Sequence, residues 1–138
     1  GFTPSGDQVY VSLRDENRVA VIDTSTREVT NRIEVGPNPI QMFTTPDGAY
    51  VYVANQGTDA EPNNTVSVID TATGQVVKTL TTGGGAHGVS ASTDGTFVFV
   101  TNIADDTVSI IDVASQEVVK TVPVGDRPNG IVYGDPTR

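Results

Sequence analysis

His87 is the residue best suited to chemistry, because it is the single histidine of the chain. It lies in the glycine-rich stretch 83–88, where glycines could let a ligand approach the backbone closely. An imidazole nitrogen can bind a metal ion or the iron of a haem. A lone histidine without a second ligand is a poor metal site, so a loop residue that bonds neighbouring backbone is the alternative interpretation.

A second set of candidate ligands lies in the acidic stretch 58–64. Asp59, Glu61 and Asn63 alternate there, and oxygen atoms at such spacing could hold a calcium ion. The glycine-containing ligand loop with a terminal glutamate is missing, so a solvated loop of turn-forming residues is the alternative. A further set of carboxylates occupies the same position in every unit of the chain, which predicts turn caps rather than catalysis: Asp23, Asp70 and Asp112.

The composition excludes several other kinds of chemistry. There is no cysteine, so disulfides and thiolate metal sites are ruled out. One histidine and no Gly-x-Ser-x-Gly elbow argue against a serine hydrolase, and no phosphate-binding Gly-x-x-x-x-Gly-Lys motif is present. The 17 acidic and 8 basic residues give a net charge of −9, which disfavours nucleic acid and anionic membranes. No apolar run is long enough for a membrane-spanning helix.

The elements that must position these residues repeat three times. Gly6 and Gly48 are 42 residues apart, and Gly48 and Gly95 are 47 apart, with one insertion around residues 57–64. We place the repeat units at about 1–39, 40–87 and 88–129, with the start of a fourth at 130–138. Short runs rich in valine, tyrosine, phenylalanine and isoleucine alternate with Pro-Asp-Gly-like and Asp-Thr-x-Thr-Gly turns. Each unit therefore predicts four antiparallel strands and essentially no helix.

The strands are apolar on both faces. Residues 50–54 and 97–100 are examples, whereas a sheet with one wet face would alternate apolar and polar side chains. A sheet that is buried on both faces, in a chain without helices, must lie between copies of itself. Radial stacking of such sheets is the β-propeller, and a β-sandwich is the alternative.

The repeated segments resemble the YVTN repeat of β-propellers. Phe99-Val100-Thr101-Asn102 and Tyr52-Val53-Ala54-Asn55 carry the family's motif, while Leu13 replaces the asparagine in the first copy. The resemblance covers nearly the whole chain and implies exported surface-layer or periplasmic proteins of usually about seven blades. It therefore implies an extracytoplasmic location and a role in binding and scaffolding.

Three blades in a permuted phase are expected, because the chain opens at the first turn and ends with a lone innermost strand. The outer faces of such an arc would be apolar, so it is either a fragment of a longer ring or a chain that closes a ring with a second copy. The connection that precedes each innermost strand would lie near the central channel. On this register Pro39 and Pro128 match His87, and the candidate rim residues are Asn38, His87, Arg127 and Asn129.

The leading hypothesis from the sequence is a non-enzymatic binding or scaffold module without a cofactor, whose loops contact a protein, a glycan or other propeller blades. A structural surface lattice is a second possibility of the same kind. The alternative from another class is a propeller segment of a haem- or quinone-binding oxidoreductase, in which His87 contacts the cofactor. Paired carboxylates for glycoside hydrolysis remain open, since acids from different loops could converge.

Overall fold

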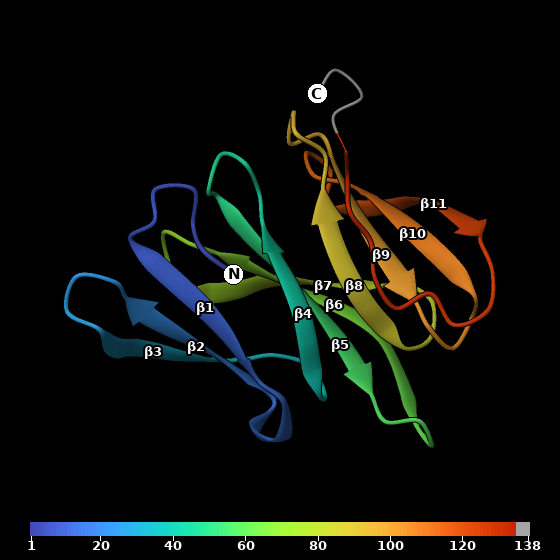
Figure 1. Ribbon diagram of the computed structural model, residues 1–138, viewed down its shortest axis with the longest axis horizontal. Helices are drawn as coiled ribbons and strands as arrows, with labels where there is room; N and C mark the ends of the chain where they lie inside the picture. The colour runs from blue at the N-terminus through green and yellow to red at the C-terminus, as the bar shows by residue number, and fades with distance from the viewer. Residues whose placement is uncertain (135–138) are drawn as a thin grey trace.

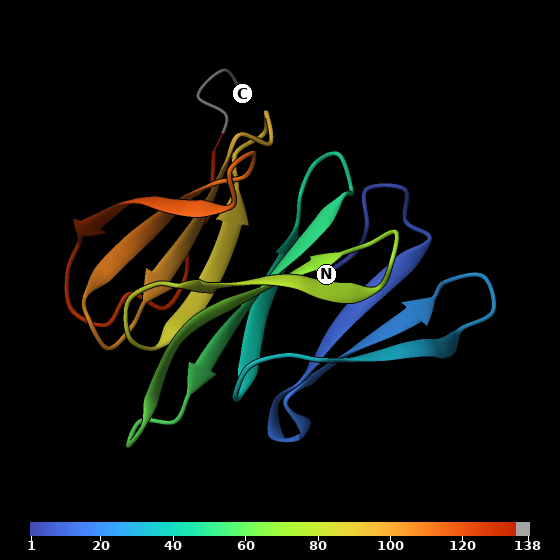
Figure 2. The ribbon, with the colours of Figure 1, turned by 180° about the vertical axis from the view of Figure 1, so that it is seen from behind.

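Three antiparallel sheets stand side by side in the computed structural model, which describes residues 1–134 (Figure 1; Figure 2 shows the reverse side). The innermost strands of adjacent sheets pack together more extensively than the outermost strands, so the sheets fan out like blades. The strands are β1 (Gln8–Leu13), β2 (Arg18–Asp23) and β3 (Glu28–Glu34) in the first sheet; β4 (Pro39–Thr44), β5 (Tyr50–Gly57), β6 (Pro62–Asp70) and β7 (Gln75–Thr81) in the second; and β8 (Ala86–Ala91), β9 (Phe97–Asn102), β10 (Thr107–Asp112) and β11 (Glu117–Pro123) in the third.

The predicted all-β propeller architecture is confirmed. One short 3₁₀ turn, η1 (Arg14–Glu16), is the single helical element within residues 1–134, which agrees with the expectation of essentially no helix. None of the helical structure in this part of the chain is long and apolar enough to cross a membrane.

The permuted phase appears at both ends of the arc. The first sheet has three strands, but residues 1–3 run beside β1: the Tyr10 amide donates to the Gly1 carbonyl at 2.8 Å and the Thr3 amide to the Gln8 carbonyl at 3.0 Å. At the other end, the predicted innermost strand of a fourth unit forms no sheet within the described residues. Tyr133 instead stacks on Phe99 with the ring centroids 5.8 Å apart. Residues 135–138 of that unit lie outside the described residues.

The second sheet shows why a strand that is apolar on both faces predicts a propeller. Tyr52 and Ala54 of β5 belong to a buried cluster shared with the third sheet, whereas Val51 and Val53 belong to a cluster shared with the first. All four side chains are fully buried. Successive side chains of a strand point to opposite faces, so burial of both sets requires a neighbour on each side.

The recurrent aspartates cap turns, as the sequence predicts. The Oδ1 atoms of Asp23, Asp70 and Asp112 accept backbone N–H groups three residues further on, each at 2.8 Å. Hydrogen bonds hold the pKa of Asp23 and Asp112 below its ordinary value, chiefly from the Ser25 hydroxyl to Asp23 and from the Ser115 amide to Asp112. These carboxylates therefore serve the turns of the fold.

Replacing Tyr52 with phenylalanine is expected to stabilise the protein by about 1 kcal/mol, because a buried hydroxyl without a partner costs free energy. The Tyr52 hydroxyl is buried and has no hydrogen-bond partner within residues 1–134, and Phe99 occupies the same position in the third sheet. Burial raises the pKa of Tyr52 from 10.0 to about 12. The unfolded chain therefore loses this proton first as the pH rises, and wild-type stability should fall over that range. Urea denaturation at neutral and alkaline pH measures both effects.

Tyr10→Phe is the matched control for this prediction. The Tyr10 hydroxyl donates to Oε1 of Gln8 at 3.1 Å, so its removal loses a hydrogen bond and should lower the urea midpoint. A Tyr52→Phe variant that is destabilised as much as Tyr10→Phe would show that the Tyr52 hydroxyl is satisfied in solution.

Candidate functional site

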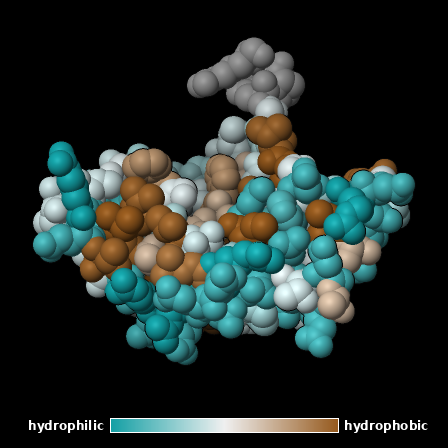
Figure 3. Space-filling model, turned by 60° about the horizontal axis from the view of Figure 1, so that its bottom comes forward, coloured by the Kyte–Doolittle hydropathy of each residue, from teal (hydrophilic) through white to brown (hydrophobic). Residues whose placement is uncertain are grey.

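The candidate site lies at one end of the strands, which we call the connection end. It is formed by the segments that lead from one sheet into the next, residues 35–38, 82–85 and 124–127, and by the turns 14–17, 58–61 and 103–106. The β5–β6 hairpin projects at this end, at the bottom of Figure 1. With this end turned forward, polar surface covers much of the molecule, and apolar surface gathers toward the side of the first sheet (left in Figure 3).

His87 lies on a β-bulge at the start of the innermost strand β8. Ala86 pairs with Asn102 and Val89 with Val100, so His87 and Gly88 together stand opposite Thr101. A bulge inserts an extra residue and changes the direction of the side chain that it carries, and such bulges are frequent beside active sites. The local structure thus presents His87 at the connection end.

The structural register around His87 differs by one residue from the register taken from the sequence. The residue that enters each innermost strand has a left-handed backbone, and a proline or alanine follows it: Asn38 (φ 48°) before Pro39, Gly85 (φ 69°) before Ala86, and Arg127 (φ 50°) before Pro128. Pro39 and Ala86 also pair with equivalent asparagines, Asn55 and Asn102. His87 therefore corresponds to Ile40 and Asn129, and the match to Pro39 and Pro128 is wrong.

The glycines around His87 are explained by contacts within the chain. A Cβ on Gly83 would lie 2.8 Å from the Asn102 side chain, and one on Gly85 would lie 2.7 Å from Ile103. The Gly84 amide donates to the Asp105 carboxylate at 2.7 Å, and the Gly85 carbonyl accepts the Ile103 amide at 2.9 Å. The glycines therefore let the connection pack tightly on the 103–106 turn, which holds the backbone before His87 in place.

The imidazole of His87 has a nitrogen that the protein does not satisfy. Its Nδ1 atom is buried without a hydrogen-bond partner within residues 1–134, while the residue as a whole is partly exposed. Nearly all buried polar atoms in proteins find a partner, and an exception calls for an explanation such as an ordered water, a bound ion, strain or a catalytic role. Four other buried side-chain atoms share this state within residues 1–134, and among the five the imidazole nitrogen is the one suited to bind a metal. The expected alternative, an imidazole bonded to neighbouring backbone, is not what the structure shows for this atom.

The other predicted rim residues are held by the turns of the connection end. The Asn38 amide donates to Asn17 Oδ1 at 2.9 Å, and the Arg127 amide donates to Asp106 Oδ1 at 2.8 Å. Asn129 is exposed, and its carbonyl oxygen lies close to Gly88. Asn17 and Asp106, polar turn residues that were expected to be merely solvated, therefore bind connection amides; the signal that could have revealed this is their spacing of 21 residues from those amides.

Arg127 and Asp59 approach each other across two sheets, a pair that the sequence did not predict. The guanidinium lies 3.9 Å from the carboxylate, and both side chains are largely exposed, so the attraction is weak. Between them lies a cavity of about 30 Å³, also lined by Gly85 and Ile103, which has room for little more than a water molecule.

Two of the predicted calcium ligands, Asp59 and Asn63, have other partners in the structure. Asp59 faces Arg127, and Asn63 Oδ1 accepts the Thr65 amide at 3.0 Å and the Thr65 hydroxyl at 2.6 Å. No group of three histidine, aspartate or glutamate residues suited to a metal ion occurs in the part of the chain that the structure describes.

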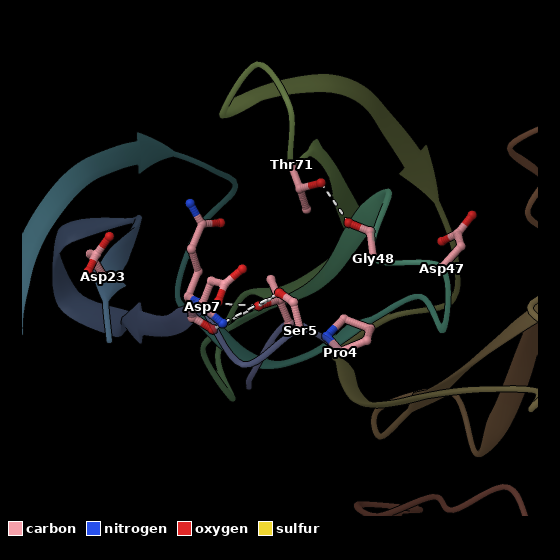
Figure 4. Close-up of a pocket in the computed structure, with 9 residues that line it drawn as sticks. Pro4, Ser5, Asp7, Asp23, Asp47, Gly48 and Thr71 are labelled. Carbon is pink, nitrogen blue, oxygen red and sulfur yellow. Dashed lines mark hydrogen bonds between the residues drawn. The ribbon is translucent and has the colours of Figure 1, made fainter. Parts of the chain in front are cut away.

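A larger polar pocket of about 330 Å³ lies at the opposite end of the strands, between turns of the first and second sheets (Figure 4). Its groups are largely used by the fold. Thr71 Oγ1 donates to the Gly48 carbonyl at 2.6 Å, Asp23 caps its own turn, and Asp47 accepts the Thr45 hydroxyl at 2.6 Å. None of the predicted site residues lines this pocket.

Comparisons with known proteins identify what kind of propeller this is. Residues 3–131 match the family described as the Cytochrome D1 heme domain. The structure of Kuenenia stuttgartiensis hydrazine synthase superposes with a TM-score of 0.86 at 27% identity, over 94% of this chain and 36% of that one. Dihydro-heme d1 dehydrogenase NirN in complex with DHE superposes with a TM-score of 0.75 at 21% identity, over 91% of this chain and 26% of that one. No curated protein sequence matches.

These findings correct the leading functional hypothesis. The chain spans about a third of the length of the hydrazine synthase chain and about a quarter of the NirN chain, and both share its propeller fold. The prediction of a non-enzymatic scaffold rested on the propeller architecture and on the resemblance to the YVTN repeat, and the match to a family of haem domains contradicts it and agrees better with the haem-binding alternative. The chain belongs to the Cytochrome D1 heme domain family.

Proposed function

We propose that this chain is a segment of a haem-binding oxidoreductase propeller and that His87 contacts the haem. The family match over residues 3–131 supports a haem of the d1 type, and the two solved structures support the propeller scaffold. The observation that carries the proposal is the unpartnered, buried Nδ1 atom of His87 on the bulge of an innermost strand. It is the one imidazole of the chain and stands at the end where the connections converge.

The residues present fit such a cofactor at a single ligand position. His87 would hold the haem, and Arg127 and Asn129 would contact it or the substrate from the next connection. Arg127 is suited to a carboxylate, since its only ionic partner within the described residues is the weakly bound Asp59. A bound haem would supply the redox-active iron, while the protein sets its orientation and surroundings.

We also propose what surrounds this segment in the protein. Apolar side chains remain exposed at both ends of the arc, on Val11 of the first sheet and on Val132 and Tyr133 of the segment after the third sheet, and we propose that further propeller blades cover them. We also propose an extracytoplasmic location, which is compatible with the family match. We also propose that the repeats are of the YVTN type, on the basis of residues Tyr52–Asn55 and Phe99–Asn102.

Titration of the purified full chain with haem d1 tests this function. We expect a saturable change in the haem absorption spectrum at a single equivalent, with a dissociation constant in the micromolar range or below, on the order of 1 μM. The same titration in urea, where the chain is unfolded, is the control. A spectrum that is the same with and without folded protein would refute the proposal.

A further inference from the structure

We propose that Thr101 is a positioning residue for His87: its hydroxyl fixes the β-bulge and thereby the direction of the imidazole. This inference deepens the proposed function, because it concerns how the protein prepares the residue that meets the haem. Thr101 does not itself contact the cofactor in this proposal.

The geometry of the bulge supports this role. Thr101 lies on β9 directly opposite His87 and Gly88, and it is 1% exposed. The Gly88 amide donates to Thr101 Oγ1 at 2.7 Å in a buried hydrogen bond. A bulge leaves one residue without its ladder partner, so a side-chain acceptor at this point supplies what the neighbouring strand cannot.

Gly88 is adapted to the same contact. A Cβ at this position would lie 2.9 Å from Thr101 Oγ1 and 3.2 Å from the Asn129 carbonyl oxygen. Any other residue would therefore push the hydroxyl away or shift the strand. Gly88 and Thr101 act as a unit that ties the residue after His87 to the neighbouring strand.

The other sheets show that the fold does not require this hydrogen bond. In the second sheet, Ile40 and Gln41 form the corresponding bulge opposite Ala54, which has no hydroxyl. In the first sheet the equivalent residue is Ser12, which donates to the Ile40 carbonyl instead, at 2.9 Å. Within residues 1–134, the combination of glycine in the bulge and threonine opposite occurs only in the sheet that carries His87.

Loss of the hydroxyl would leave the Gly88 amide buried without an acceptor. A buried unpaired amide is costly, so the bulge would relax toward conformations that satisfy it elsewhere. His87 is the adjacent residue and would then sample several directions. Cofactor sites tolerate such loosening poorly, because a ligand must be held close to its productive geometry.

Thr101→Val removes the hydroxyl at nearly constant shape, and Thr101→Ser is the matched control that keeps it. In the cofactor-free protein we expect the Gly88 amide of Thr101→Val to exchange with solvent about tenfold faster. The Hα–Hβ couplings of His87, which report its side-chain rotamer, should become averaged. With haem d1 added, Thr101→Val should bind about tenfold more weakly and with an altered absorption spectrum. Thr101→Ser should resemble the wild type in all three measurements.

The measurements without haem test the inference, and the measurements with haem test the proposed function on which it rests. Unchanged Gly88 exchange and His87 couplings in Thr101→Val would overturn the inference, even if the wild type binds haem. If the wild type binds no haem but His87 samples several rotamers in Thr101→Val, the proposed function is refuted. The inference that the Thr101 hydroxyl orients His87 is then still supported. Should Thr101→Val not fold, the wild type alone decides: a Gly88 amide that exchanges as fast as the exposed Gly134 amide would overturn the inference.

Discussion

Substitution of His87 by alanine is expected to weaken binding of haem d1 by about 100-fold or more and to remove the spectral signature of a nitrogen ligand. Loss of an orienting neighbour of a metal ligand already costs about 10- to 100-fold, and His87 is the one imidazole available. The stability of the cofactor-free protein should change little, because the buried Nδ1 atom makes no hydrogen bond within the described residues. Absorbance titration and urea denaturation of the same samples measure the two quantities.

Lys120→Ala is the control for this substitution. Lys120 is exposed in the middle of β11, at the edge of the third sheet opposite to β8, and its replacement should leave haem affinity within a factor of about two. Free imidazole added to His87→Ala should restore the nitrogen-ligand spectrum, because it supplies the missing group. A His87→Ala variant that binds haem with wild-type affinity and spectrum would exclude His87 as the ligand.

The fold could be predicted from the sequence because the decisive signal is local. The strand at 50–54 is apolar at every position, and its alternate side chains are buried against two different sheets. The register around His87 could not be predicted as reliably. A bulge adds a residue to both β4 and β8, and the left-handed residue is Asn38 before β4, Gly85 before β8 and Arg127 in the connection after the third sheet. The residue type at that position is not repeated, so the sequence alone does not reveal it.

The function could not be predicted from architecture, since one fold carries many activities. His87 was visible as a candidate, but a lone histidine carries little weight until its bulge and its unpartnered nitrogen are seen. The contact between Thr101 and Gly88 joins residues 13 apart, and only the pairing of β8 with β9 brings them together. The family match added what neither the spacing nor the composition contained.

Asn102→Ala is expected to lower the free energy of unfolding by about 3 kcal/mol, the largest effect on stability that we predict for a polar residue. Asn102 is fully buried, and its Nδ2 atom donates to Thr107 Oγ1 and Ser109 Oγ, both at 2.9 Å. Alanine would remove both donors, leave a buried Ser109 hydroxyl with fewer partners, and open a cavity beneath Gly83. Urea denaturation measures this free energy. Asn31→Ala is the control, because it removes one exposed hydrogen bond, from Asn31 Nδ2 to the Gly74 carbonyl. It should lower the free energy of unfolding by less than about 0.5 kcal/mol.

The first sheet lacks both members of this hydrogen-bonded asparagine–serine pair. The second and third sheets have Asn55 with Ser67 and Asn102 with Ser109, whereas the first sheet has Leu13 and Ala20 at the equivalent positions. Without its serine the asparagine would lose an acceptor for its Nδ2 atom, and without its asparagine the serine would lose the donor to its Oγ atom, whereas losing both avoids these costs. The double variant Asn102→Ala/Ser109→Ala should therefore be less destabilised than the sum of the two single variants, by roughly 0.5–1 kcal/mol. Strict additivity of the two substitutions would mean that the buried asparagine stabilises the sheet by packing alone.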